Sequence, residues 1–208
     1  MDRKDSPVVW PSLEEELKVV LPYLKGNVLN AGSGNRDISG FVTGKVYNLD
    51  IYPHKLPGGI MLGSVADMPL KSGFFDAVVC NAVLEHVKDP PKAVTEMGRV
   101  LKTGGYLYLS IPFLQPVHDV PGDYIRYTLE GLRRLVEDNG FRVVEVMGIH
   151  TAYHTLGWIA YEWLTSKRCL TYSLLKLILY PLIRYKSAHS KHYVESIASA
   201  YSVLAVKK

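Results

Sequence analysis

Cysteine is scarce in this chain of 208 residues, which has only Cys80 and Cys169. Two cysteines predict neither a disulfide framework nor a zinc site, and they favour a reducing compartment, so we expect a cytoplasmic protein. The chain also lacks a run of the roughly 20 uninterrupted apolar residues that a membrane-spanning helix needs. Residues 1–5 lead into no apolar signal core, which argues against secretion.

A general excess of charge of either sign is missing as well. The formal net charge is +4, and the surplus belongs to one late segment. From His150 to His192 there are six basic residues against one acidic residue, Glu162, whereas the rest of the chain has 18 basic and 19 acidic residues. A basic surface of the kind that binds nucleic acid is therefore not predicted.

The sequence does contain an apolar run that is followed directly by a segment with two glycines. Val28–Gly34 reads VLNAGSG, and the next apolar run ends at Asp50. A buried strand, a glycine turn and an acidic residue about 20 positions further on are typical of nucleotide-binding sites in doubly wound sheets. The glycines allow close backbone approach, and a carboxylate can accept hydrogen bonds from both hydroxyls of a ribose.

Strand-like and helix-like segments alternate along most of the chain. Hydrophobic runs predict strands at Val28–Asn30, Val46–Asp50, Ile60–Leu62, Phe75–Asn81, Tyr106–Ile111, Phe141–Gly148 and Ser199–Val206. Capping residues and periodicity predict helices at Ser12–Leu24, Asp89–Leu101 and Thr128–Asn139, with Gly104-Gly105 stopping the second. This order predicts a mostly parallel sheet with helices on both faces.

One stretch interrupts this alternation. Residues 149–197 are rich in tyrosine and tryptophan, and they separate two strands where a few residues would suffice. We interpret them as a helical insertion and a candidate substrate lid, in which Pro181 kinks or ends a helix. We therefore expect one domain over 1–208, made of an N-terminal helical segment (1–25), a core (26–148), the insertion and a last strand (198–208).

Four blocks in the expected order resemble the class I S-adenosylmethionine-dependent methyltransferases, and most closely their type 11 branch. They are Val28–Gly34, Asn48–Asp50, Gly63–Leu70 and Phe74–Val87, and Glu96–Gly105 resembles the helix and turn that follow in this family. The resemblance covers about residues 25–148 and the last strand. It implies an α/β, Rossmann-like, doubly wound sheet of seven mostly parallel strands, with an antiparallel last strand preceded by the helical insertion.

The resemblance also implies a cofactor, S-adenosyl-L-methionine, and the residues that bind it. Gly32 and Gly34 would approach its methionine part, Asp50 would hold the ribose, Asp67 and Met68 would contact the adenine, and Asn81 would lie near the sulfonium. The full predicted set is Asn30, Ala31, Gly32, Ser33, Gly34, Asp50, Ile51, Asp67, Met68, Asn81 and Ala82. We predict no metal site.

The chain departs from the family in two places. The family usually has an acidic residue where this chain has Asn30, and the segment Arg36–Gly44 is short for the first crossover helix. A nicotinamide-dependent oxidoreductase would also use a ribose carboxylate, but Asp37 stands where that motif needs its third glycine, and its charge would oppose a pyrophosphate.

Several side chains that could bind or deprotonate an acceptor follow the fifth predicted strand. In the family that the sequence resembles, this loop lies over the methyl group of the cofactor. We predict His118 as a general base, Asp123 or Asp119 as the residue that orients it, and Arg126 as a contact to an anionic part of the acceptor. The alternative is that Asp123 and Arg126 form a salt bridge that only fixes the loop. Glu85-His86 is interpreted as structural, with Glu85 satisfying backbone donors.

The leading hypothesis is a cytoplasmic methyltransferase that acts on a small-molecule or lipid-linked acceptor, with a sugar-like hydroxyl and a quinone-like ring both open. A cofactor-binding but catalytically silent interaction module is the alternative. Nucleic acid is not expected as acceptor, because no Asn/Asp-Pro-Pro-Tyr/Phe tetrapeptide follows the fourth predicted strand. Residues 167–186 combine apolar and basic side chains, which suits peripheral contact with a membrane. The alternative is a helix packed over the sheet or a dimer contact.

Overall fold

Seven strands form one mixed sheet in the computed structural model, which describes residues 6–118, 122–166, 169–191 and 193–208. The strands are β1 (Lys25–Ala31), β2 (Thr43–Asp50), β3 (Met61–Leu62), β4 (Phe75–Asn81), β5 (Leu101–Pro112), β6 (Phe141–Ile149) and β7 (Ala200–Lys207). Their order is β3-β2-β1-β4-β5-β7-β6, and β7 runs antiparallel to both of its neighbours. The predicted fold, including the antiparallel last strand, is confirmed.

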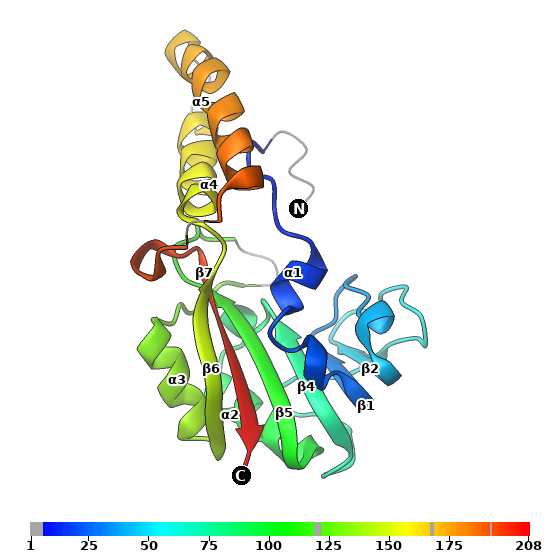
Figure 1. The fold of residues 1–208 in the computed structure, drawn as a ribbon. Coiled ribbons are helices and arrows are strands. Elements are labelled where there is room, and N and C mark those ends of the chain that lie inside the picture. The colour runs from blue at the N-terminus through cyan, green and yellow to red at the C-terminus, as the bar shows by residue number, and fades with distance from the viewer. Residues whose placement is uncertain (1–5, 119–121, 167–168, 192) are drawn as a thin grey trace.

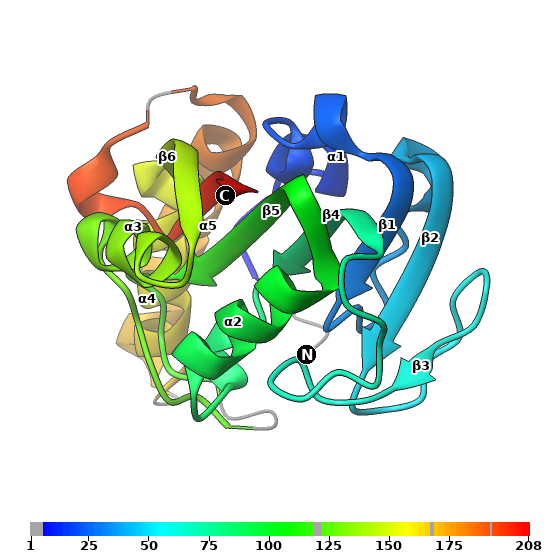
Figure 2. The ribbon, with the colours of Figure 1, turned by 90° about the horizontal axis from the view of Figure 1, so that it is seen from below.

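The two faces of the sheet are covered unequally, as Figure 2 shows. Helices α2 (Pro90–Val100) and α3 (Leu129–Glu137) pack on one face, over a large core that includes Val78 and Leu107. The other face is covered by α1 (Leu13–Leu17) and by two short 3₁₀ segments, η1 (Leu21–Tyr23) and η2 (Ser39–Phe41). The first crossover is thus a single 3₁₀ turn, as the short spacing suggested.

Two predicted helix boundaries were wrong. Ser12 does cap α1 with Glu15 in a capping box, but the helix ends at Leu17 instead of Leu24. Pro22, which has no N–H to continue an α-helix, lies in the separate 3₁₀ segment η1. Helix α2 ends at Val100, where β5 begins, so Gly104-Gly105 lies within β5 and does not stop the helix.

The insertion is a helical hairpin of α4 (Ala152–Thr165) and α5 (Leu170–His189), followed by η4 (Glu195–Ile197). Pro181 does not end α5, which continues for eight more residues. Packing compensates for the lost hydrogen bond: Ile183 is buried so close to Gly157 of α4 that a Cβ there would meet it at 2.6 Å. Figure 1 shows the two helices side by side, standing beyond the edge of the sheet.

Every parallel strand ends at the same edge of the sheet, the edge from which the hairpin rises (Figure 1). The turns after β1, β2, β4 and β5 therefore meet there, and α1 approaches them from the second face of the sheet. In open α/β sheets this carboxyl edge is where ligands bind.

Candidate functional site

Two cavities open at the carboxyl edge of the sheet. The first has a volume of about 860 Å³ and lies between the turns that follow β1, β2 and β4. Its size is within the range of small-molecule sites. Six of the predicted cofactor residues line it: Gly32, Ser33, Gly34, Asp50, Ile51 and Ala82.

The glycine turn after β1 has the backbone conformation that the sequence indicated. Gly32 and Gly34 have φ angles of +68° and +51°, which side chains with a Cβ rarely adopt. A Cβ on Gly32 would also lie 2.5 Å from a methyl carbon of Val83, so the turn has no room for one. The glycines therefore keep the backbone exposed to the first cavity.

Asp50 joins this turn to the end of β2. The Gly34 amide donates to its Oδ2 atom at 2.8 Å, and the Tyr52 amide donates to Oδ1 at 2.9 Å. His54 lies 3.7 Å from Oδ1, through its Nε2 atom. The carboxylate is thus fixed beside the glycine turn and retains lone pairs for a ligand in the first cavity.

Four other predicted cofactor residues, Asn30, Ala31, Asp67 and Met68, do not line the first cavity. Asn30 is buried and donates to the Arg36 carbonyl at 2.9 Å and to the Asn48 side chain at 3.1 Å. The neutral amide therefore organises the crossover loop. Met68 is buried and Asp67 exposed, both in the loop that precedes β4.

The second cavity, about 820 Å³, lies on the other side of the β4 turn. The residues that line it come from the N-terminal segment, the turns after β1 and β4, the end of β5 and the loop that follows it, the end of β6, α4 and the start of β7. Arg36 and Ala82 line both cavities, so the two adjoin there. Asn81, predicted to lie near the sulfonium, faces the second cavity.

Sequence reasoning missed most of the second cavity. Trp10 contacts Trp158 with ring centroids 5.3 Å apart, and Glu16 accepts a hydrogen bond from Asn81 at 3.0 Å. Burial alone would raise the pKa of Glu16, but interactions with His150 and Asn81 outweigh it and hold this pKa below its ordinary value. No local motif marks these residues, because they lie far apart in the sequence and only the fold brings them together.

Of the three predicted catalytic residues, only His118 lines the second cavity. Its backbone amide donates to Asp123 Oδ2 at 3.0 Å, and its Nδ1 atom lies 3.5 Å from the same oxygen. Both terminal nitrogens of Arg126 donate to Asp123, which lowers the pKa of Asp123 to about 2. The Asp123–Arg126 salt bridge is therefore present, and Asp119, the other residue predicted to orient His118, lies outside the described residues.

Glu85 and His86 lie where the two cavities meet, in the 3₁₀ turn η3 (Leu84–His86). His86 lines the first cavity, and Glu85 lines the second together with His118. The Glu85 carboxylate, whose Oε1 atom lies 3.8 Å from His118 Nε2, is the main reason that the pKa of His118 is raised. The prediction that the Glu85 carboxylate satisfies backbone donors was wrong for the described residues: it faces two imidazoles.

With this geometry established, the fold and the glycine turn resemble those of the class I methyltransferases. The family model described as a methyltransferase domain matches residues 29–109 and confirms the resemblance carried by the sequence motifs. The cofactor predicted for the chain, S-adenosylmethionine, is the one on which this class depends.

Known proteins agree with that assignment. A probable S-adenosylmethionine-dependent methyltransferase of Mycolicibacterium smegmatis is 31% identical over 144 residues, which are 59% of this chain and 54% of that protein. A ubiquinone/menaquinone biosynthesis C-methyltransferase of Vibrio cholerae is 28% identical over 134 residues, 64% of this chain and 42% of that protein. This chain thus spans about half the length of these relatives.

A solved structure shares the fold. It is a SAM-dependent methyltransferase from Archaeoglobus fulgidus, with a TM-score of 0.56 and 15% identity, and the match covers 94% of this chain and 93% of that one. Within the described part of this chain, no helix is both long enough and apolar enough to cross a membrane.

Proposed function

We propose that this protein transfers a methyl group from S-adenosylmethionine, bound in the first cavity, to an acceptor bound in the second. The observation that carries the proposal is the wall that the cavities share. Ala82 lines both, and its φ of +54° turns the chain sharply at the carboxyl end of β4. A sulfonium on one side and a nucleophile on the other would meet there, and methyl transfer requires chiefly that alignment.

The first cavity suits the cofactor residue by residue. We assign the backbone around Gly32 and Gly34 to the methionine part and the Asp50 carboxylate to the ribose hydroxyls. Arg36, which lines both cavities and donates to the Asn81 carbonyl, is placed to pair with the methionine carboxylate. Asp67 and Met68 do not line the first cavity, and they remain predicted contacts to the adenine. To make these contacts, the loop before β4 would have to move toward the bound cofactor.

The walls of the second cavity favour a planar acceptor. Trp158 contacts both Trp10 and His118, with ring centroids 5.3 Å and 5.9 Å apart. Flat aromatic walls with a few polar groups favour a flat ring that carries hydroxyls over a sugar. Of the two acceptors left open by the sequence, we therefore propose the quinone-like ring, and the quinone-biosynthesis relative from Vibrio cholerae supports this choice.

His118 is the residue that we propose as the base for a hydroxyl acceptor. Its raised pKa makes the neutral imidazole a stronger base, which suits removal of a weakly acidic proton. Asp123 would orient the ring from the Nδ1 side, and Arg126 would hold Asp123 in place.

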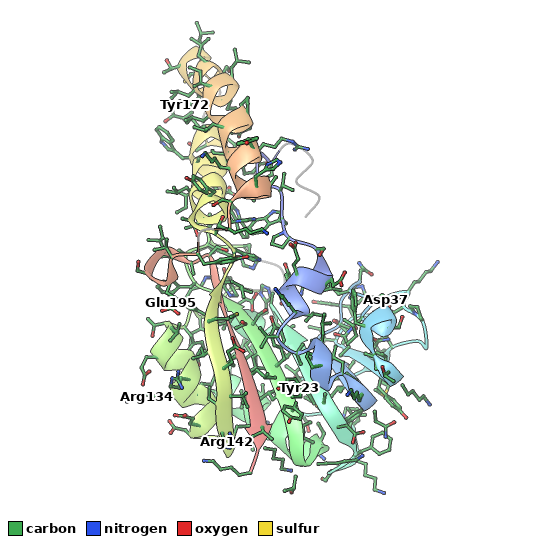
Figure 3. All side chains as sticks on the ribbon, in the orientation of Figure 1. Tyr23, Asp37, Arg134, Arg142, Tyr172 and Glu195 are labelled. Atoms are coloured by element: carbon green, nitrogen blue, oxygen red, sulfur yellow. The ribbon has the colours of Figure 1, made fainter. Side chains whose placement is uncertain are left out.

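The α4–α5 hairpin suggests that the acceptor carries an apolar chain. Trp158 of α4 lines the second cavity, while Leu170, Leu177 and Ile178 of α5 are 77%, 74% and 69% exposed. Tyr172 marks the far end of the hairpin in Figure 3, beside Trp163 of α4. Basic residues along α5, Lys176, Arg184 and Lys186, would favour an anionic membrane surface, whereas Lys167 and Arg168 lie outside the described residues.

Calorimetric titration of S-adenosylhomocysteine tests the cofactor site. We expect micromolar binding by the wild type and a loss of about 1.5–3 kcal/mol in Asp50→Ala, since a buried, charged hydrogen-bond acceptor is removed. Asp50→Asn keeps the shape of the turn and separates loss of charge from loss of packing. Asp138→Ala, an exposed acid at the end of α3, is the matched control. If the folded wild type does not bind S-adenosylhomocysteine, the proposed cofactor site is wrong.

Turnover with a panel of dihydroxybenzenes and reduced quinones, followed with labelled S-adenosylmethionine, tests the reaction. His118→Ala should lower kcat by about 10²–10⁴-fold and leave S-adenosylhomocysteine binding unchanged. Binding without turnover across the panel would instead support the catalytically silent module.

Vesicle flotation tests the hairpin. Anionic vesicles should capture the wild type, whereas Leu177→Asp with Ile178→Asp should stay unbound. If the vesicles capture the wild type and the variant equally, Leu177 and Ile178 do not contact the membrane.

A further inference from the structure

Three potential metal ligands converge where the two cavities meet. The Nε2 atoms of His86 and His118 lie 3.7 Å and 3.8 Å from the same oxygen of Glu85, Oε1. All three ligand atoms lie within 4.8 Å of one another. They come from η3 after β4 and from the loop after β5, two segments that the parallel pairing of β4 and β5 brings to the same edge.

The opposite nitrogen of each imidazole already has a partner. His86 Nδ1 contacts the Gly122 carbonyl oxygen, and His118 Nδ1 lies 3.3 Å from the Pro116 carbonyl oxygen and 3.5 Å from Asp123 Oδ2. When Nδ1 donates to a carbonyl or carboxylate, Nε2 is left as a lone pair. Metal-binding histidines almost always have an outer partner of this kind, which sets the tautomer and the ring orientation.

Glu85 carries the strongest indication that something is bound. Its side chain is only 1% exposed, and its second oxygen, Oε2, is buried with no hydrogen-bond partner among the described residues. A buried carboxylate with an unused oxygen is stabilised by a positive charge beside it, which a bound cation or a protonated imidazole supplies.

We propose that Glu85, His86 and His118 bind a divalent transition-metal ion. Two imidazoles and one carboxylate form a ligand set that suits zinc and related first-row metals and leaves positions open for water or substrate. Two ligand atoms that each lie about 2.0–2.1 Å from a tetrahedral ion are separated from one another by about 3.3 Å. The distances from Glu85 Oε1 to the Nε2 atoms of His86 and His118 would therefore have to shorten by about half an ångström.

The location gives the ion a role at the reaction site. His86 faces the first cavity, and Glu85 and His118 face the second, so the open coordination positions would point toward the acceptor. This role rests on the proposed methyl transfer, whereas ion binding itself does not. An acceptor hydroxyl bound to the ion would lose its proton more readily, to water in the second cavity. With its Nε2 atom bound to the ion, His118 would serve as a ligand, and it would act as the base only in the ion-free protein.

The test uses the metal alone. The full chain is treated with a chelator, and Zn²⁺ is titrated by calorimetry, with Co²⁺ absorbance as a second reading of nitrogen and oxygen ligation. We expect one ion per chain with micromolar or tighter affinity. His86→Ala, His118→Ala and Glu85→Gln should each weaken binding at least tenfold. His189→Ala, which removes an exposed histidine of α5, is the matched control and should bind as the wild type does.

Glu85→Gln keeps the size of the buried side chain, so we expect this variant to fold. Circular dichroism checks the fold of every variant. Absence of one-to-one binding, or unchanged affinity in folded Glu85→Gln, would overturn the metal site. Titration of S-adenosylhomocysteine into the same samples separates the two proposals: cofactor binding without metal binding refutes only the metal site, and the reverse result refutes only the cofactor site.

Discussion

The Asn81 side chain donates to the Glu16 carboxylate at 3.0 Å, although 65 positions separate the two residues in the sequence. Glu16 also lies 3.5 Å from His150 Nε2, and its carbonyl oxygen accepts from the Tyr108 hydroxyl at 2.6 Å. Helix α1 is thereby attached to the end of β4, to β5 and to the residue that follows β6, and its Glu16 side chain lines the second cavity.

Replacement of Glu16 should therefore loosen the N-terminal segment. We expect Glu16→Ala to lower the free energy of unfolding by about 1–3 kcal/mol, because it leaves Asn81 and His150 without their charged partner. The KM for the acceptor should rise, with S-adenosylhomocysteine affinity nearly unchanged. Glu14→Ala removes an exposed acid from the same helical turn and should have little effect on either quantity. Urea unfolding measures the free energy of unfolding, and steady-state kinetics measure the KM for the acceptor.

The glycine turn after β1 should tolerate no Cβ at Gly32. Gly32→Ala combines left-handed backbone strain with a clash against Val83, and we expect it to lower the free energy of unfolding by about 2–4 kcal/mol. Gly59→Ala has a similar φ of +75° but open space around it, so only the strain of about 1–2 kcal/mol should appear. Equal losses in the two variants, measured by urea unfolding, would show that Val83 moves aside.

Arg99 of α2 holds the loop that carries Asp67 and Met68. Its guanidinium donates to Glu96 and to the carbonyl oxygens of Met68 and Leu70. Arg99→Lys cannot reproduce this planar fork, and we expect a loss of about 1–2 kcal/mol at this partly exposed site.

If Asp67 and Met68 contact the adenine, Arg99→Lys should also weaken S-adenosylhomocysteine binding. Arg134→Lys alters a far more exposed ion pair on α3 and serves as the control. Weakened stability with unchanged cofactor affinity would argue against the predicted adenine contacts.

His154 should make stability depend on pH. Burial, followed by the nearby His150, lowers the pKa of His154 to about 4, with Glu15 opposing the shift. The folded protein then binds fewer protons than the unfolded chain between about pH 4 and 6.5, so stability falls as the pH falls through this range. We expect a loss of about 2 kcal/mol between pH 7 and 5. Urea unfolding of wild type and His154→Gln at both pH values measures the difference, which should shrink in the variant.

The order of elements and the first cavity could be predicted from the sequence because their signals are local. A buried strand is a short apolar run, and β4 was predicted at Phe75–Asn81 with both ends correct. The glycine turn and Asp50 each follow directly after such a run, so their placement at the carboxyl edge follows from the parallel order of the strands.

Helix ends were less predictable because they depend on competition between neighbouring elements. Val100 and Leu101 are equally apolar, and only the pairing of Leu101 with Phe75 decides that one belongs to a helix and the other to a strand. Pro181 has a strong local preference to end a helix, yet the packing of Ile183 against α4 outweighs it.

By itself the sequence determined the fold class, the glycine turn and the ribose carboxylate, since each depends on residues within one strand and the turn that follows it. Only the tertiary structure decided which side chains face one another in the second cavity. Glu16, Glu85 and His118 belong to separate segments, and no spacing between them could indicate their meeting. They are brought together because parallel strands deliver successive turns to one edge, where α1 then covers them.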